Sequence, residues 1–96
     1  MRINIENSEM FTTVLESTIN FKIYHPITGL TNDSRQIQKG DLYIAMNGQY
    51  NDGHSFLDDV CKKGAASAIV QESDNEIDFQ QLQVHDTMLT LKELAT

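Results

Sequence analysis

The fold is decided by residues 39–46, which read Lys-Gly-Asp-Leu-Tyr-Ile-Ala-Met. The first three residues are typical of a turn. They are followed by an apolar run, Leu42 to Met46, in which apolar and polar residues do not alternate. A strand that is covered on both faces has such a continuous run, whereas a half-exposed strand alternates. The stretch therefore predicts a buried strand of a parallel sheet.

Helix and strand signals follow one another on both sides of this strand. Apolar spacing predicts helices near residues 8–17, 53–63 and 86–95. Further strands are expected at 67–70 and 82–84, with β-like residues from Ile27 onward and a short strand or extended connection at 20–26. This order predicts an α/β fold, a small mixed or parallel sheet flanked by helices and joined by helical crossovers.

The same spacing predicts which side chains are buried and where the helices begin and end. The first helix is expected to bury Met10, Phe11, Val14 and Leu15, and the second Phe56, Leu57, Val60 and Cys61. The core should include Leu42, Ile44, Phe56, Val60 and Ile69. Asn7 or Ser8 can cap the first helix and Asp52 or Ser55 the second, which should stop at Lys62, Lys63 and Gly64.

Length and charge limit the function classes. The chain has 96 residues, enough for one domain, and a formal net charge of −7, which argues against a nucleic-acid partner. Cys61 is the single cysteine, as expected in a reducing compartment. No apolar run approaches a membrane span and the N-terminus lacks a signal-peptide core, so we expect a cytoplasmic protein without a membrane partner.

Two polar loops offer the densest set of ligand-binding groups. Residues 32–35 read Asn-Asp-Ser-Arg, and residues 48–54 read Gly-Gln-Tyr-Asn-Asp-Gly-His. Each follows a β-like segment, so both should lie at the carboxyl edge of the sheet, where open α/β sheets bind ligands. No nucleophile–base pair, phosphate loop or zinc motif is present. Taken alone, Asp33-Ser34 is better explained as a local turn, and His54 as a surface or helix-start residue.

The linked motifs resemble the N-terminal domain of the Mur ligase family. The match is carried by Asp33-Ser34-Arg35, Gly40-Asp41-Leu42-Tyr43-Ile44-Ala45, Gly48, Asp52-Gly53-His54 and Gly64-Ala65, in order and in register. Tyr43 stands where the family usually has Phe. The resemblance implies a domain of a larger ligase that binds the UDP end of a UDP-N-acetylmuramoyl-peptide during peptidoglycan synthesis. The ATPase domain and the amino-acid-binding domain of such a ligase would lie outside this chain.

The resemblance also implies the site residues. The expected UDP-binding set is Asn32, Ser34, Arg35, Gln49, Tyr50, Asn51, Asp52, Gly53 and His54, with no catalytic and no metal-binding residue. Asn32 and Ser34 match positions that contact uridine, and 49–51 match the segment near the uracil and diphosphate. Asp52 and Gly53 are expected mainly to shape the loop. This chain should need no cofactor and should be inactive alone, since ATP and Mg²⁺ belong to the ATPase domain of the parent.

Two ligases of the family share this type of domain. One adds the third stem-peptide residue, diaminopimelate or lysine, to UDP-N-acetylmuramoyl-L-alanyl-D-glutamate, and the motifs favour it. The other adds D-alanyl-D-alanine and remains an alternative. A third alternative, from a different class, is a non-catalytic scaffold or interaction module that keeps the fold without the ligand.

Overall fold

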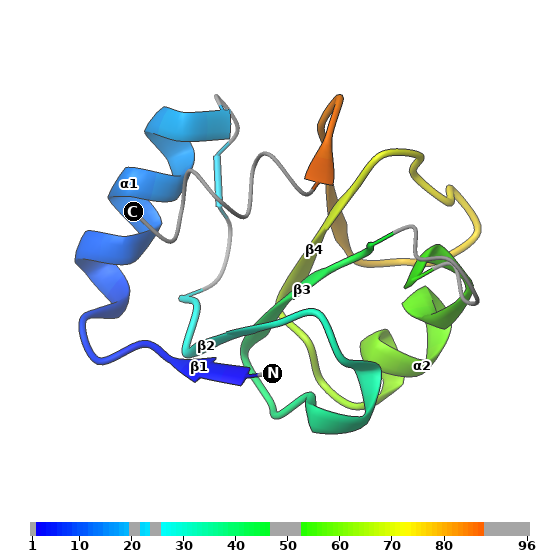
Figure 1. Cartoon of the computed structure of the whole chain (residues 1–96), viewed down its shortest axis with the longest axis horizontal. Coiled ribbons are helices and arrows are strands. Elements are labelled where there is room, and N and C mark those ends of the chain that lie inside the picture. The colour runs from blue at the N-terminus through cyan, green and yellow to red at the C-terminus, as the bar shows by residue number, and fades with distance from the viewer. Residues whose placement is uncertain (1, 20–21, 24–25, 47–52, 88–96) are drawn as a thin grey trace.

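The computed structural model describes residues 2–19, 22–23, 26–46 and 53–87, which form a five-stranded sheet with helices on both sides (Figure 1). The strands are β1 (Arg2–Asn4), β2 (Gly29–Thr31), β3 (Asp41–Ile44), β4 (Ser67–Val70) and β5 (Gln80–Gln83). Their order across the sheet is their order in the sequence. β1 runs antiparallel to β2, and the other neighbours are parallel. The predicted α/β class and mixed sheet are therefore confirmed, with the apolar run as its central strand.

The edges of the sheet differ from the prediction more than its centre does. β1 was not predicted, because three residues are too few to show a period and the partner strand lies 25 or more positions away. β5 begins two residues earlier than expected. Of residues 20–26, only 22, 23 and 26 are described, and none of them lies in a strand.

The helices are α1 (Ser8–Ile19) and α2 (Leu57–Lys62), with short 3₁₀ helices η1 (Ser34–Gln36) and η2 (Gly53–Phe56). α1 confirms the helix predicted at 8–17, and Asn7 caps it by accepting the N–H of Met10 at 3.0 Å. The predicted helix 53–63 is wrong in its first turn, which is 3₁₀. Its cap at Ser55 is also wrong, since the N-cap position belongs to Phe56 and carries no side-chain cap. Most of the predicted helix 86–95 lies outside the described residues.

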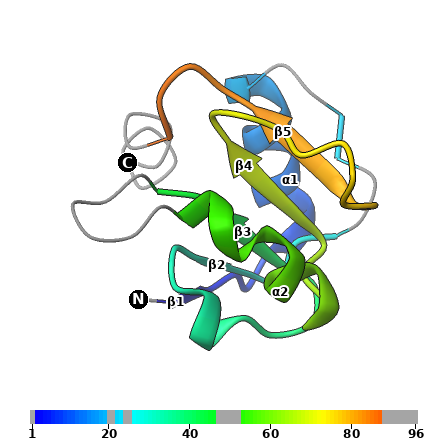
Figure 2. The same cartoon turned by 90° about the vertical axis from the view of Figure 1, so that its right-hand side faces the viewer.

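The connections between parallel strands are less helical than expected. The β3–β4 connection contains α2, whereas the β2–β3 connection contains only η1 and residues 71–79 form turns. Gly64 follows the end of α2 and has a φ of +98°. This is the left-handed conformation that a glycine after a helix predicts. Figure 2 shows α1 and α2 on opposite faces of the sheet.

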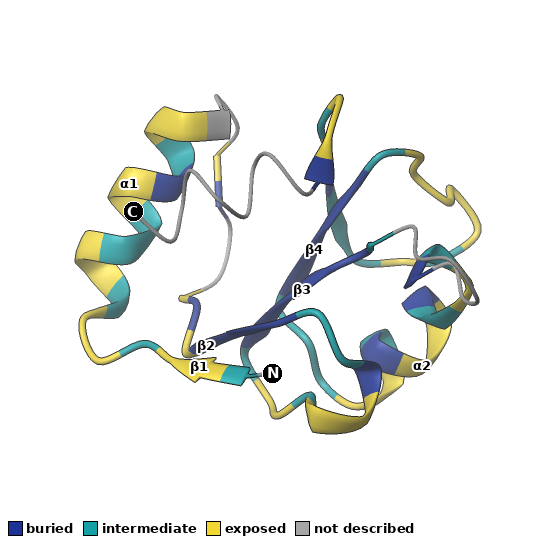
Figure 3. Ribbon diagram, in the orientation of Figure 1, coloured by how far each residue is buried: buried dark blue, intermediate teal, exposed yellow. Residues whose placement is uncertain are grey.

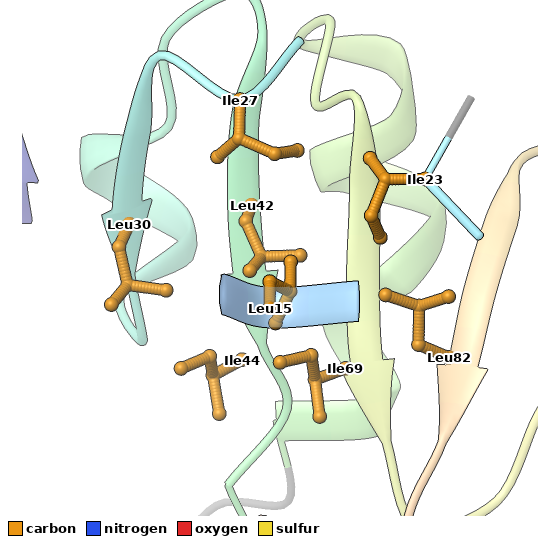
Figure 4. Packing of buried hydrophobic residues seen from close by; sticks show 8 residues of the cluster. All are labelled: Leu15, Ile23, Ile27, Leu30, Leu42, Ile44, Ile69 and Leu82. Carbon is orange, nitrogen blue, oxygen red and sulfur yellow. The ribbon is translucent and has the colours of Figure 1, made fainter. Parts of the chain in front are cut away.

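Each face of the sheet has its own core. Side chains alternate along β3, so Leu42 and Ile44 face α1 whereas Tyr43 and Ala45 face α2. Figure 4 shows Leu15 of α1 lying over the β3 and β4 side chains, and Figure 3 shows both strands buried. The α1 cluster comprises Leu15, Ile23, Ile27, Leu30, Leu42, Ile44, Ile69 and Leu82. The α2 cluster comprises Tyr43, Ala45, Leu57, Val60, Ala68 and Val70.

The predicted core is confirmed in its strands and corrected in its helices. Leu42, Ile44, Val60 and Ile69 are fully buried, but Phe56 is only half-buried at the margin of the α2 cluster, because it stands where η2 passes into α2. Cys61 is likewise half-buried.

The stripe predicted for α1 is rotated from the one observed. Met10 and Val14 are 64% and 49% exposed. The less exposed side of α1 is instead Ser8, Phe11, Thr12 and Leu15, so two hydroxyl residues occupy positions that an apolar pattern would not select.

Candidate functional site

The carboxyl ends of four parallel strands form one edge of the sheet. β2, β3, β4 and β5 are neighbours and run in the same direction, so the segments that follow them leave the sheet side by side. Among the predicted site residues, Asn32, Ser34, Arg35, Gly53 and His54 are described. The predicted residues Gln49, Tyr50, Asn51 and Asp52 lie outside the described residues. We call the edge of the sheet at which β2, β3, β4 and β5 end the carboxyl edge.

The exit from β2 is a tight turn held by its own side chains. The buried Thr31 hydroxyl accepts the N–H of Asp33 at 3.0 Å, and Asp33 Oδ1 accepts the N–H of Arg35 at 2.9 Å. Asp33 thereby caps η1. The local-turn interpretation of Asp33-Ser34 is confirmed.

The charges of this turn cancel. Arg35 donates from Nε to Asp33 Oδ1 at 3.1 Å and from Nη2 to Oδ2 at 3.0 Å. The side-chain hydrogen bonds from Arg35, and then its backbone N–H, lower the pKa of Asp33 to about 2, so the carboxylate stays ionised. The Arg35 side chain is 86% exposed. An anion approaching this turn therefore meets an ion pair, not an isolated cation.

Ser34 lies between the β2 exit and the end of α2. It is 8% exposed, and its carbonyl accepts Lys63 Nζ at 2.9 Å. The same ammonium pairs with Asp59 at 3.0 Å. Lys63 thus does more than favour the helix terminus, since it also fixes η1 against α2.

The exit from β3 is closed by Gly53. Its N–H donates to the Met46 carbonyl at 2.7 Å, and its own carbonyl accepts the Tyr43 hydroxyl at 2.9 Å. A Cβ at Gly53 would lie 2.6 Å from Met46 N and 3.0 Å from Tyr43 Oη. A side chain at this position would therefore clash with two neighbouring groups, which explains why this chain has glycine here. The Gly53 N–H is therefore engaged within the protein, by the Met46 carbonyl.

His54 turns its ring toward the next strand exit. Its Nε2 accepts the N–H of Gln71 at 2.9 Å and that of Glu72 at 3.4 Å. Gln71 Oε1 in turn accepts the N–H and hydroxyl of Thr87, each at 3.2 Å. Sequence reasoning missed Gln71 and Thr87, because nothing local marks a glutamine after a strand as the partner of a histidine 17 positions earlier.

Within the described ranges, no group of three or more His, Cys, Asp or Glu side chains could hold a metal ion. The same part of the chain contains no helix long and apolar enough to cross a membrane. The described features define an α/β domain whose strands end in a hydrogen-bonded polar edge.

The comparisons with known proteins give the family. Residues 26–95 match the family model described as "Mur ligase family, catalytic domain". This match covers more than half of the chain, so the chain belongs to the Mur ligase family.

Relatives in the family include two kinds of ligase. The UDP-N-acetylmuramoyl-L-alanyl-D-glutamate--2,6-diaminopimelate ligase of Cytophaga hutchinsonii is 36% identical over 73 residues, which are 73% of this chain and 15% of the relative. The UDP-N-acetylmuramoyl-tripeptide--D-alanyl-D-alanine ligase of Escherichia coli is 38% identical over 69 residues, 72% of this chain and 15% of the relative. The chain thus spans about 15% of the length of these curated relatives.

Solved structures show the same arrangement. The UDP-N-acetylmuramoylalanyl-D-glutamyl-2,6-diaminopimelate--D-alanyl-D-alanyl ligase of Acinetobacter baumannii superposes with a TM-score of 0.74 at 27% identity, covering 85% of this chain and 20% of that one. The MurF ligase of Thermotoga maritima, solved in complex with ADP, gives a TM-score of 0.63 at 29% identity, covering 69% of this chain and 15% of that one. The α/β fold is therefore that of Mur ligase structures.

Proposed function

We propose that this chain is the N-terminal, UDP-sugar-binding domain of a longer ATP-dependent Mur ligase that acts in the cytoplasm. Its carboxyl edge would hold the UDP portion of UDP-N-acetylmuramoyl-L-alanyl-D-glutamate, while the parent enzyme adds the third stem-peptide residue. The chain's small share of its relatives' length supports this, since it leaves room for an ATPase domain and an amino-acid domain. ATP and Mg²⁺ would bind in that ATPase domain.

One observation carries the proposal. β2 and β3 are parallel neighbours with Thr31 opposite Tyr43, so the two motif loops that follow them leave the same edge side by side. The sheet register therefore supports a common ligand-binding edge for the two motifs. We assign the UDP contacts to Asn32, Ser34, Arg35, Gln49, Tyr50, Asn51 and His54, and expect Asp52 and Gly53, the other two members of the set, mainly to shape the loop.

The charge of the domain dictates how an anion would be recognised. With a net charge of −7, the overall field repels a diphosphate, so recognition must be local. Arg35 is already paired with Asp33. Uracil hydrogen bonds from the 32–35 turn and backbone N–H groups are therefore expected to outweigh direct ion pairing.

The D-alanyl-D-alanine-adding ligase is the second candidate. It is favoured by the two solved structures named above, which are ligases of that type, whereas the curated relatives include both types. Both candidates bind the UDP end of a related precursor, so they share the proposed site and differ in the peptide that the parent elongates.

Amide NMR of this chain during titration with UDP-N-acetylmuramoyl-L-alanyl-D-glutamate tests the proposal. Amide shifts should concentrate in residues 32–35 and 53–54, and ADP, which presents a purine, should not reproduce them. Shifts confined to α1 or to residues 72–78 would contradict the assigned edge. If no amide shifts at millimolar ligand, the scaffold alternative would be favoured over substrate binding.

A further inference from the structure

The carbonyl of Ser34 is bound by a side chain from a distant part of the sequence. Lys63, at the end of α2, donates from Nζ to Ser34 O at 2.9 Å, across 29 positions of the chain. The bond is partly buried, and the Lys63 side chain is 39% exposed. The turn at residues 32–35 therefore lies against the end of α2 (Figure 1).

The bonds within that turn are local. Thr31 Oγ1 accepts the N–H of Asp33 at 3.0 Å, and Asp33 Oδ1 accepts the N–H of Arg35 at 2.9 Å. These bonds fix the shape of the turn and its junction with β2, but they do not join it to α2. The Lys63 ammonium makes that connection, so it helps to determine where the Ser34 peptide group lies relative to the helix.

The Lys63 ammonium is itself held in place by α2. Its backbone N–H donates to the Asp59 carbonyl at 3.0 Å, and its Nζ lies 3.0 Å from the Asp59 carboxylate. The positive charge is thus already balanced, which favours a structural contact over the capture of a ligand phosphate. Ile37, which follows η1, packs at the margin of the α2 cluster, so the ammonium adds a directional bond to an apolar contact nearby.

We propose that Lys63 is a positioning residue for nucleotide binding: through the Ser34 carbonyl it fixes the 32–35 turn in the place that the uridine requires. The inference rests on the proposed function and adds to its site a residue outside the set that contacts UDP. A turn that can move against α2 must be ordered when the ligand binds, and this ordering lowers the affinity.

Lys62 offers a matched control. It is adjacent to Lys63, and each lysine pairs with the aspartate four positions before it, Lys62 with Asp58 at 2.8 Å and Lys63 with Asp59 at 3.0 Å. Lys62→Met and Lys63→Met therefore remove the same charge and a similar ion pair, and they differ in the bond to Ser34. Lys63→Arg is the conservative variant, because it keeps a cationic donor at this position.

Two measurements test the contact and its effect. In carbon NMR of the ligand-free chain, the Ser34 carbonyl should shift in Lys63→Met and stay at its wild-type frequency in Lys62→Met. In calorimetry with UDP-N-acetylmuramoyl-L-alanyl-D-glutamate, Lys63→Met should bind about fivefold more weakly than Lys62→Met, the loss of about one hydrogen bond. Lys63→Arg should bind as the wild type does. Thermal unfolding confirms that each variant is folded at the temperature of the titration.

Salt separates positioning from direct contact with the diphosphate. The ratio of the Kd of Lys63→Met to that of Lys62→Met should be the same at about 0.05 M and about 0.5 M salt, because the lost bond lies within the protein. An exposed ion pair with the ligand would instead be screened at the higher concentration. A ratio that falls to one in high salt would make Lys63 a phosphate contact and overturn the positioning role.

Three further outcomes would overturn it: a Ser34 carbonyl that does not respond to Lys63→Met, equal affinities of Lys63→Met and Lys62→Met, or a Lys63→Arg chain as weak as Lys63→Met. A wild-type chain that does not bind the UDP-sugar would refute the proposed function, and the positioning role with it. The Ser34 carbonyl shift distinguishes these failures, because it reports the bond from Lys63 without any ligand.

Discussion

Arg2 and Asp41, 39 positions apart, form a two-point ion pair that fixes the N-terminal strand to the centre of the sheet. Arg2 Nε lies 2.8 Å from Asp41 Oδ2, and Nη2 lies 2.7 Å from Oδ1. Asp41 is fully buried and also accepts the Gln38 N–H at 2.9 Å. Between them lies Gly29 of β2, where a Cβ would touch both side chains. The glycine thus lets an arginine from β1 cross β2 to reach β3.

Breaking this pair should destabilise the domain. Asp41→Asn leaves Arg2 without its charged partner, and we expect a loss of about 2–3 kcal/mol in the free energy of unfolding, less than for a fully buried pair because Arg2 keeps some solvent contact. Arg2→Met should destabilise the domain more, since it leaves the fully buried Asp41 carboxylate without its cation. Urea denaturation measures both. Arg35→Met, which breaks an exposed pair, is the control and should change little.

Gly53→Ala should disturb the edge more than a surface substitution would. The new Cβ would lie 2.6 Å from Met46 N, and that backbone cannot retreat without lengthening the 2.7 Å bond from Gly53 N to Met46 O. We expect about 1–3 kcal/mol of destabilisation from this overpacking. Thermal unfolding reports the stability, and Ser17→Ala, at an exposed serine of α1, is the control. A Gly53→Ala chain as stable as the wild type would mean that the turn is looser than described.

The centre of the fold and its turns could be predicted because their signals are local. The run from Leu42 is apolar without interruption, and Gly64 follows two lysines at a helix end, so each stretch carries its own evidence. The strand β1 could not be predicted, because it is stabilised by the distant partners of Arg2. The buried side of α1 was misjudged because it includes the hydroxyl groups of Ser8 and Thr12, and a search for apolar spacing does not detect polar residues.

The candidate site likewise has a part that could be predicted from the sequence and a part that could not. The Asn32–Arg35 turn could be predicted, since Asp33 bonds within two residues of itself. The role of His54 could not, because its partner Gln71 becomes a neighbour only when β3 and β4 pair. Family motifs marked His54 as important but could not distinguish a ligand contact from a side chain that bonds the backbone.

Leu57→Ala should be more damaging than Phe56→Ala, although the sequence favoured Phe56 as a core residue. Leu57 is 1% exposed within the α2 cluster, so its truncation should cost about 2–5 kcal/mol. Phe56 lies half-buried at the margin, and its truncation should cost less than the about 3–5 kcal/mol expected of a buried phenylalanine. Urea denaturation of the two variants compares them. The reverse order would show that the Phe56 ring, not Leu57, fills the space under α2.

The Asp33–Arg35 turn should lose its contribution to stability in strong acid. The folded-state pKa of Asp33 is lowered from 3.8 to about 2, chiefly by the Arg35 side chain. A carboxyl group whose pKa is lower in the folded than in the unfolded state stabilises the fold at any pH above its unfolded-state pKa. This contribution disappears as the pH falls from about 4 to about 2. NMR titration of the Asp33 carboxyl should show the low pKa, and Arg35→Met should raise it toward 3.8. An Asp33 pKa that ignores Arg35→Met would contradict the ion pair.

Ser34→Ala should weaken UDP-sugar binding without unfolding the domain. Ser34 sits at the start of η1, and its carbonyl is held by Lys63, so the backbone of the turn should survive loss of the hydroxyl. If that hydroxyl contacts uridine, its removal should cost about 0.5–1.5 kcal/mol in binding, the value of one neutral hydrogen bond, or about a two- to tenfold rise in Kd. Calorimetry with UDP-N-acetylmuramoyl-L-alanyl-D-glutamate measures the change, and thermal unfolding confirms equal stability. Ser17→Ala, an exposed serine on α1, supplies the control, since α1 lies on the other face of the sheet. Equal affinity of Ser34→Ala and Ser17→Ala would remove Ser34 from the proposed site and leave the backbone of the turn as the part of it that recognises the nucleotide.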